Sequence, residues 1–227
     1  MNSDKLTQFN KFTAREGPVV LIVMDGIGLR EEEEMNAFKL ADTPFLDEIQ
    51  EKWPEKGLYA ELKAHGTAVG LPTDEEMGNS EVGHNAFGAG SVVKQRALIA
   101  KEAIESNDLF NMKKWTRMAS KIKKKQKSLH LIGLLSDGYV HSHISHLIGI
   151  LRGARASGVG RVRVHPLLDG RDVPPQSALE YVKQLEDELN QINKRDGFDY
   201  RIASGGGRMR VTMDRYNSDW DVVRRGW

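Results

Sequence analysis

The sequence predicts an α/β protein with a parallel sheet, because strand and helix patterns alternate through its second half. Strands are expected at residues 129–135, 161–168 and 200–203, the first of them apolar, with a helix at 145–156 and a long amphipathic helix at 176–192 between them. Such an alternation folds through right-handed crossovers, so we expect a doubly wound parallel unit. The composition, 39% hydrophobic and 29% charged, is typical of a globular chain.

The first half of the chain gives shorter signals. Residues 18–24, Pro-Val-Val-Leu-Ile-Val-Met, are apolar and rich in β-branched side chains, which predicts a strand buried on both faces of a sheet. Asp25 follows at the strand end, where ligands of open α/β sheets bind, although Asp-Gly is also a common turn. Thr43-Pro44 predicts a helix start, and a second strand is expected at 59–62.

Charge and cysteine content exclude several classes of function. The chain carries 33 basic and 32 acidic side chains in 227 residues, so no general attraction to nucleic acid or anionic membranes is expected. The absence of cysteine excludes disulfides and thiolate catalysis. The N-terminus is polar and no apolar run approaches about 20 residues, so we expect a cytoplasmic protein. The basic run 121–127 is expected to be a solvated helix end, with polyanion binding as the alternative.

Residues 77–90 contain the first candidate reactive group. Ser80 lies between Gly78 and Gly83, and glycines permit a tight turn and close approach of a ligand. The following residues can start a helix, and the N–H groups at a helix N-terminus suit a phosphoryl group. The alternative is that Asn79 or Ser80 only caps the helix. His84 is expected to pack and hydrogen-bond within this segment, with a part in the chemistry as the alternative.

Polar residues follow each strand of the second half. Because the carboxyl ends of parallel strands meet at one edge, the loops after these strands should face one crevice. Arginines there can bind phosphate or carboxylate oxygens through two hydrogen bonds each, although a surface salt bridge is the alternative for any one of them. The predicted anion-binding residues are His141, Arg171, Asp172, Arg208 and Arg215.

The histidines of residues 141–146 also suggest a metal site, since imidazole is a common ligand. His143 and His146 are three apart and can share a helix face. His141 precedes the expected helix, and no local carboxylate or cysteine completes a tetrahedral set. We therefore favour a role other than metal binding for this cluster.

Six ordered motifs resemble the N-terminal part of the 2,3-bisphosphoglycerate-independent phosphoglycerate mutases, members of the alkaline phosphatase superfamily. Together they extend over nearly the whole chain, and six in order are far more specific than any one. The loop at 205–213 resembles the longer variant of the plant and trypanosomatid branch. The matching stretches are residues 24–26, 64–72, 77–84, 134–142, 169–175 and 204–216.

The resemblance implies two partial domains and an activity. A three-layer, parallel-sheet phosphatase-like domain is expected at residues 1–92 and a second α/β transferase domain at 93–227. The implied reaction interconverts 3-phosphoglycerate and 2-phosphoglycerate through a phosphoserine intermediate. It uses two Mn²⁺ ions, which Mg²⁺ or Co²⁺ can replace, and no 2,3-bisphosphoglycerate. The expected partner is this small-molecule substrate, without nucleic acid or membrane, and the complete enzyme is expected to be a monomer.

The resemblance also implies a role for each matching residue. Ser80 corresponds to the nucleophile and to a ligand of one metal ion, and Asp25 to a second ligand of that ion. The five crevice residues correspond to the phosphoglycerate-binding set, in which Asp172 also exchanges protons with the glycerate hydroxyls. The chemistry agrees, because a cation activates a serine hydroxyl that is otherwise a poor nucleophile.

Members of this family are longer than the present chain. Two oxygen ligands, from Asp25 and Ser80, do not satisfy two cations that each take four to six. By resemblance, the other ligands lie beyond Trp227, so we expect the 227-residue chain to be inactive alone. The alternatives are a metal-dependent phosphatase of the same superfamily, in which water replaces glycerate, and a non-catalytic fragment that binds phosphate or carboxylate groups.

Overall fold

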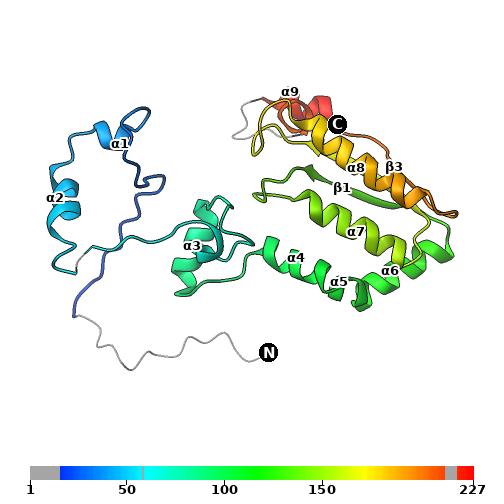
Figure 1. Ribbon diagram of the computed structural model, residues 1–227, viewed down its shortest axis with the longest axis horizontal. Coiled ribbons are helices and arrows are strands. Elements are labelled where there is room, and N and C mark those ends of the chain that lie inside the picture. The colour runs from blue at the N-terminus through cyan, green and yellow to red at the C-terminus, as the bar shows by residue number, and fades with distance from the viewer. Residues whose placement is uncertain (1–15, 58, 213–218) are drawn as a thin grey trace. The chain divides into compact units, whose positions relative to one another are not determined.

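The computed structural model describes residues 16–57, 59–212 and 219–227 (Figure 1). The chain divides into two compact units, Met1–Ala60 and Glu61–Trp227. The second unit contains a parallel sheet with helices packed against it, which confirms the predicted α/β class. The domain boundary expected between residues 92 and 93 stays a prediction.

The first unit contains two short helices, α1 (Ala37–Leu40) and α2 (Pro44–Lys52). Helix α2 begins where the sequence predicts, with Pro44 in its first turn and Thr43 as N-cap residue. The Thr43 hydroxyl donates a hydrogen bond of 2.9 Å to the carboxylate of Asp47. This bond holds the first turn of the helix to its cap.

The strands predicted at residues 18–24 and 59–62 are not formed. Residues 16–24 have no regular secondary structure, and Val19, Val20 and Leu21 are 85%, 78% and 75% exposed. A buried parallel strand requires hydrogen-bonded neighbours and covering layers, and the described part of this unit contains no strand to pair with. Asp25 therefore follows an extended, exposed segment and lies in a turn. The apolar pattern indicates that the segment is suited to burial, but it does not identify the neighbouring strands or helices that would cover it.

The segment around Ser80 has a small core of its own in the second unit. A 3₁₀ turn, η1 (Gly66–Val69), precedes α3 (Ser80–Ala89). Val69, Leu71 and Val82 bury one another between these two elements. This packing fixes the start of α3 against the loop that leads to it.

Three helices then lead to the sheet: α4 (Arg96–Glu105), α5 (Asp108–Asn111) and α6 (Lys113–Lys124). The first break lies at Asn107, which has a φ of 64°. Asparagine tolerates this left-handed conformation better than most residues, and one such residue is sufficient to end a helix.

The sheet has strand order β1-β2-β3, all parallel, with a short β4 also paired to β2. Strands β1 and β2 have the bounds that the sequence predicts, and β4 was not predicted. Helix α7 follows β1 and helix α8 follows β2, as expected. The bounds are β1 (Leu129–Leu135), α7 (Ile144–Ala156), β2 (Arg161–Leu168), α8 (Ala178–Asn193), β3 (Asp199–Ile202) and β4 (Gly206–Gly207).

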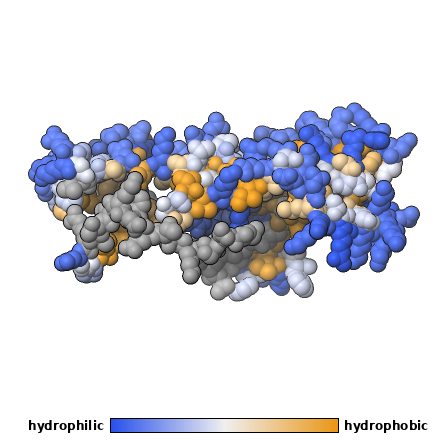
Figure 2. All heavy atoms as spheres, turned by 90° about the horizontal axis from the view of Figure 1, so that it is seen from below, coloured by the Kyte–Doolittle hydropathy of each residue, from blue (hydrophilic) through white to orange (hydrophobic). Residues whose placement is uncertain are grey.

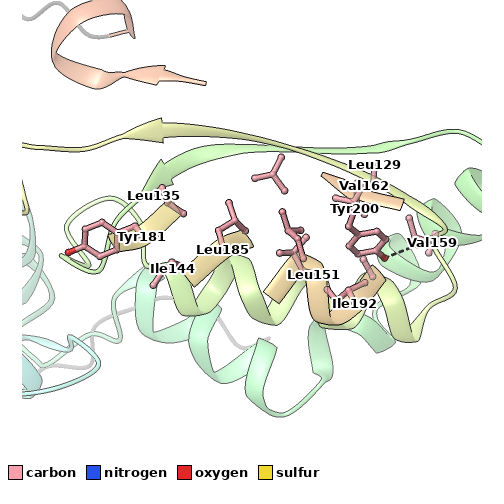
Figure 3. Packing of buried hydrophobic residues seen from close by; sticks show 14 of the residues in the cluster. Leu129, Leu135, Ile144, Leu151, Val159, Val162, Tyr181, Leu185, Ile192 and Tyr200 are labelled. Atoms are coloured by element: carbon pink, nitrogen blue, oxygen red, sulfur yellow. Dashed lines mark hydrogen bonds between the residues drawn. The ribbon is translucent and has the colours of Figure 1, made fainter. Parts of the chain in front are cut away.

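Helices α7 and α8 pack against the same face of the sheet (Figure 3), so the predicted doubly wound arrangement is wrong for this part of the chain. The strand order advances in one direction, and two right-handed crossovers in one direction place both helices on one side. The core between the layers includes Leu135, Leu151, Val162, Leu185 and Tyr200, each at most 1% exposed.

Helix α6 also contributes to this core, with Ala119 buried and Trp115, Met118 and Ile122 packed against it. The Trp115 indole N–H donates a hydrogen bond of 2.9 Å to the hydroxyl of Ser157, just past the end of α7. The apolar side of α6 is therefore fixed to the rest of the unit.

The described chain ends with a π-helical turn, η2 (Arg208–Thr212), and helix α9 (Trp220–Gly226). The two elements contact each other, and the Arg225 guanidinium donates a hydrogen bond of 3.1 Å to the carbonyl of Arg210. None of the helices in the described ranges is both long and apolar enough to cross a bilayer.

Candidate anion-binding site

The strand register brings three polar residues together. The last residues of β1 and β4 are both paired with the last residue of β2. The residues that follow these strands, Ser136, Asp169 and Arg208, therefore lie next to one another at the carboxyl edge of the sheet. The two-residue strand β4 is essential here, since it carries the chain past the end of β3 to the end of β2.

A buried ion pair occupies this edge. The Arg208 Nη1 atom lies 2.7 Å from Oδ1 of Asp169 and 2.6 Å from Oδ2 of Asp172, and the side chains of Arg208 and Asp169 are 3% and 1% exposed. Asp169 Oδ1 also accepts hydrogen bonds of 3.1 Å from the backbone N–H groups of Arg171 and Asp172. The Asp169 carboxylate thus stabilises the turn that contains Arg171 and Asp172. The same carboxylate binds Arg208 next to that turn.

The electrostatics keep both partners charged. Burial raises the pKa of Asp169, but hydrogen bonds from Ser136, from two backbone amides and from Arg208 outweigh it and lower the pKa below its usual value. Burial lowers the pKa of Arg208, and its hydrogen bonds to Asp172 and Asp169 more than reverse that effect. The pair is therefore ionised throughout the neutral range.

The other predicted crevice residues are more exposed. The Nε2 atom of His141 lies 3.8 Å from Oδ2 of Asp172, and its side chain is 50% exposed. Arg171 is exposed, and its guanidinium makes no hydrogen bond or ion pair with the residues that the structure describes. Arg215 lies outside the described residues. The structure therefore brings His141, Asp172 and Arg208 together, with Arg171 adjoining them.

Ser80 is the first residue of α3, as predicted, and it is exposed. Asn79 is the N-cap, and its side chain accepts a hydrogen bond of 3.1 Å from the N–H of Val82. The Ser80 hydroxyl lies 3.2 Å from Nδ1 of His84, which confirms that this histidine bonds within the segment. A Cβ at Gly78 would overlap the carbonyl oxygen of Ala64, so the turn before Ser80 requires glycine.

A cavity of about 740 Å³ lies between α3 and the loop after β1. Asn79 and Glu81, on either side of Ser80, line it from α3, and His141 lines it from the loop. Glu76 and His146 also line the cavity, and each has a buried side-chain atom that finds no hydrogen-bond partner among the described residues. Burial raises the pKa of Glu76 and lowers the pKa of His146, which favours the neutral form of both.

Within the histidine cluster, His143 has a structural role. His143 caps α7, because its Nδ1 accepts a hydrogen bond of 3.1 Å from the N–H of Ser145. The Tyr139 ring stacks on His143 with ring centres 3.9 Å apart. Within the described ranges, no group of three or more histidine, aspartate or glutamate side chains is arranged to hold a metal ion.

The fit to the metal ions implied by the resemblance is partial. A carboxylate from Asp25 and a hydroxyl from Ser80 are the oxygen donors that Mn²⁺ or Mg²⁺ prefers. They belong to the two different units, and they are two donors of a larger set. The donor chemistry fits, but the set is incomplete in the described part of the chain.

Asp169 is the functional residue that sequence reasoning missed. The Asp-Gly-Arg-Asp motif predicts roles for its arginine and its last aspartate, yet the first aspartate makes the contacts that position both. A signal was present, because an aspartate that follows a buried strand and precedes a glycine often bonds to the backbone two residues later.

Fold and site together define an α/β protein whose parallel sheet presents arginines, a histidine and two carboxylates at its carboxyl edge. Such a crevice suits a small molecule with phosphate or carboxylate groups. The family model described as "BPG-independent PGAM N-terminus" matches residues 100–227, more than half of the chain. The chain belongs to the 2,3-bisphosphoglycerate-independent phosphoglycerate mutase family.

Named relatives agree with this assignment. The chain is 47% identical over 209 residues to the 2,3-bisphosphoglycerate-independent phosphoglycerate mutase of Trypanosoma brucei brucei, covering 92% of the chain and 37% of the relative. The Zea mays enzyme of the same name is 46% identical, with 92% and 36% covered. A crystal structure of Leishmania mexicana phosphoglycerate mutase at low cobalt concentration matches with a TM-score of 0.70 and 46% identity, covering 83% of the chain and 34% of that protein. The chain thus spans well under half the length of these relatives.

Proposed function

We propose that the protein to which this chain contributes interconverts 3-phosphoglycerate and 2-phosphoglycerate, in the cytoplasm and as a monomer. The observation that carries the proposal is the buried Arg208 group, which fixes Asp172 and the Arg171 turn at the carboxyl edge of the sheet. Family membership supports the choice of substrate. Since the chain spans only part of its relatives, the activity belongs to the longer protein, and the 227-residue chain alone is inactive.

The phosphoglycerate is bound by His141, Arg171, Asp172, Arg208 and Arg215. Arg171 is the best placed of the described residues for direct contact, because it is exposed and lies beside Asp172. Its planar guanidinium can bind a carboxylate or phosphate through two hydrogen bonds. Arg208 supplies positive charge behind Asp172, and Asp172 exchanges protons with the glycerate hydroxyls.

Ser80 accepts the phosphoryl group and returns it to the other hydroxyl of bound glycerate. Its place at the N-terminus of α3 supports this role, because unpaired N–H groups there favour a phosphoryl group. Its hydroxyl is exposed, and both neighbours in sequence line the cavity that also reaches His141. Keeping glycerate bound and water out makes the reaction a transfer rather than a hydrolysis.

Asp25 and Ser80 supply ligands to a divalent cation, which we propose is Mn²⁺, with Mg²⁺ or Co²⁺ as replacements and no 2,3-bisphosphoglycerate. The Leishmania mexicana relative was crystallised at low cobalt concentration, which supports a metal requirement. When bound, the cation lowers the pKa of a serine hydroxyl and offsets phosphoryl charge.

The test uses the complete protein with Mn²⁺. A coupled assay follows 2-phosphoglycerate formation, a second assay follows free phosphate, and mass spectrometry detects phosphoserine. We expect Ser80→Ala to abolish both phosphoserine and mutase activity. The control is Ser91→Ala, which changes an exposed serine just past the end of the same helix and should leave both unchanged. Retained activity in Ser80→Ala would remove Ser80 from the mechanism, and phosphate release without 2-phosphoglycerate would identify a phosphatase instead.

A further inference from the structure

The segment from residue 113 to residue 127 concentrates positive charge. It contains eight basic side chains and no acidic one, and all eight are exposed. Outside this segment 25 basic side chains remain against 32 acidic ones, a net charge of −7. The near-neutral total therefore conceals one strongly cationic surface on an otherwise anionic chain.

Five of these side chains form one stripe along α6. At about 100° per residue, Lys113, Lys114, Arg117, Lys121 and Lys124 fall within about 100° of the helix circumference and extend over about 16 Å of its length. Residues Trp115, Met118, Ala119 and Ile122 occupy the other side and pack into the core. We call the five basic residues the α6 stripe.

Acidic side chains in the described part of the chain do not pair with the α6 stripe. None of its five residues makes an ion pair with any residue in the described ranges, although lysines elsewhere do, such as Lys94 with Glu102 at 2.7 Å. Figure 2 shows mostly hydrophilic residues on the surface at the right of the view. Like charges at helical spacing of three and four residues repel one another, and an anionic partner would relieve that repulsion.

The composition of the stripe favours an extended anionic surface over a nucleic acid. Four of its five residues are lysines, which act as point charges, whereas arginine is preferred for two-point recognition of individual phosphates. The aromatic side chain of the helix, Trp115, packs toward the core and is not free to stack on bases. Because the apolar side of α6 is buried, the helix cannot insert, and the contact would be electrostatic only.

We propose that the α6 stripe docks the protein on the anionic headgroups of a lipid bilayer. The stripe is a straight row of cations on the outer side of a fixed helix, so its lysines can contact a flat surface together. Each lysine or arginine near such a surface adds to the affinity, and the effect disappears at high salt. The net negative charge elsewhere would be repelled, so the stripe would also orient the protein.

The test is co-sedimentation of the 227-residue chain with vesicles of phosphatidylcholine, with or without about 30 mol% phosphatidylserine, from about 0.05 to about 0.5 M NaCl. We expect binding only to the anionic vesicles and loss of binding at high salt. Replacing Arg117, Lys121 and Lys124 with glutamine should weaken partitioning at least about tenfold. The matched control replaces three exposed lysines outside the stripe, Lys52, Lys56 and Lys63, with glutamine and should change it less than about twofold.

Equal loss of binding in the two triple variants would show a net-charge effect and overturn the proposal, as would equal binding to vesicles without phosphatidylserine. Circular dichroism of both variants checks that the helices remain. A single-stranded oligonucleotide that binds more tightly than the vesicles, through the same three residues, would make nucleic acid the occupant and would also overturn the assignment. Mutase activity is not a readout here, so this test does not depend on the proposed function.

Discussion

At the residue scale, Asp169 determines the geometry of the candidate site. One oxygen of its buried carboxylate accepts from Arg208 and from two backbone amides. Arg171 and Asp172, which are proposed to contact substrate, are thus positioned by a carboxylate that does not face solvent. The sequence predicted His141, Arg171 and Arg208 because arginines and histidines after strand ends suggest binding. It did not reveal Asp169, because burial depends on the register of β2 and β4.

Replacing Asp169 with asparagine tests this role. We expect Asp169→Asn to lower the free energy of unfolding by about 3 kcal/mol, because it leaves a buried guanidinium short of one counter-charge. Asp187→Asn is the control, since Asp187 pairs with Lys183 on the exposed side of α8 and should contribute less than about 0.5 kcal/mol. Urea denaturation followed by circular dichroism measures both. Equal values for the two variants would contradict the structural role of Asp169.

The same carboxylate predicts a pH dependence. The pKa of Asp169 is lower in the folded state than its usual value, so its contribution to stability is complete above the unfolded pKa of about 3.9 and is lost as pH falls through the folded value. The difference in unfolding free energy between the unchanged chain and Asp169→Asn should therefore shrink as pH falls from about 5 to about 2. A constant difference over this range would show that the ionised carboxylate is not what stabilises the fold.

At the element scale, the sequence predicted those strands and helices whose burial is provided within the same unit. The bounds of β1 and β2 were predicted correctly, and both strands bury side chains against α7 and α8 within the same unit. Residues 18–24 have an equally apolar pattern, yet they are exposed because the described part of their unit has no partner strand. Strand β4 was missed because it consists of two glycines, which have low strand propensity.

Glycines in α7 allow side chains of α4 and α5 to pack closely against it. A Cβ at Gly153 would overlap the ring of Phe110 in α5, whereas a Cβ at Gly88 in α3 would meet nothing within 4 Å. We expect Gly153→Ala to destabilise the chain by about 1–3 kcal/mol through overpacking. Gly88→Ala should stabilise its helix by up to about 1 kcal/mol, since alanine is the better helix former. Thermal denaturation distinguishes the two, and a gain in stability for Gly153→Ala would show that α5 and α7 do not pack closely.

At the scale of the whole molecule, the two units contain different parts of one proposed chemistry. The second unit contains Ser80 and the described crevice residues, and the first contains Asp25. The family could be predicted from the six ordered motifs. The crevice could be predicted because the carboxyl ends of parallel strands lie at one edge of a sheet. Whether residues 18–24 form a buried strand could not be predicted, because that depends on partner strands that the described part of their unit does not contain.

The central claim is that the carboxyl edge of this sheet binds phosphoglycerate through Arg171, and isothermal titration of the 227-residue chain with 3-phosphoglycerate tests it most directly. We predict a dissociation constant of about 1 mM, weakened at least about tenfold in Arg171→Ala. It should be unchanged in Arg201→Ala, whose exposed arginine on β3 pairs with Asp199 at 2.5 Å. No binding by the unchanged chain, or equal affinity in Arg171→Ala, would contradict the claim.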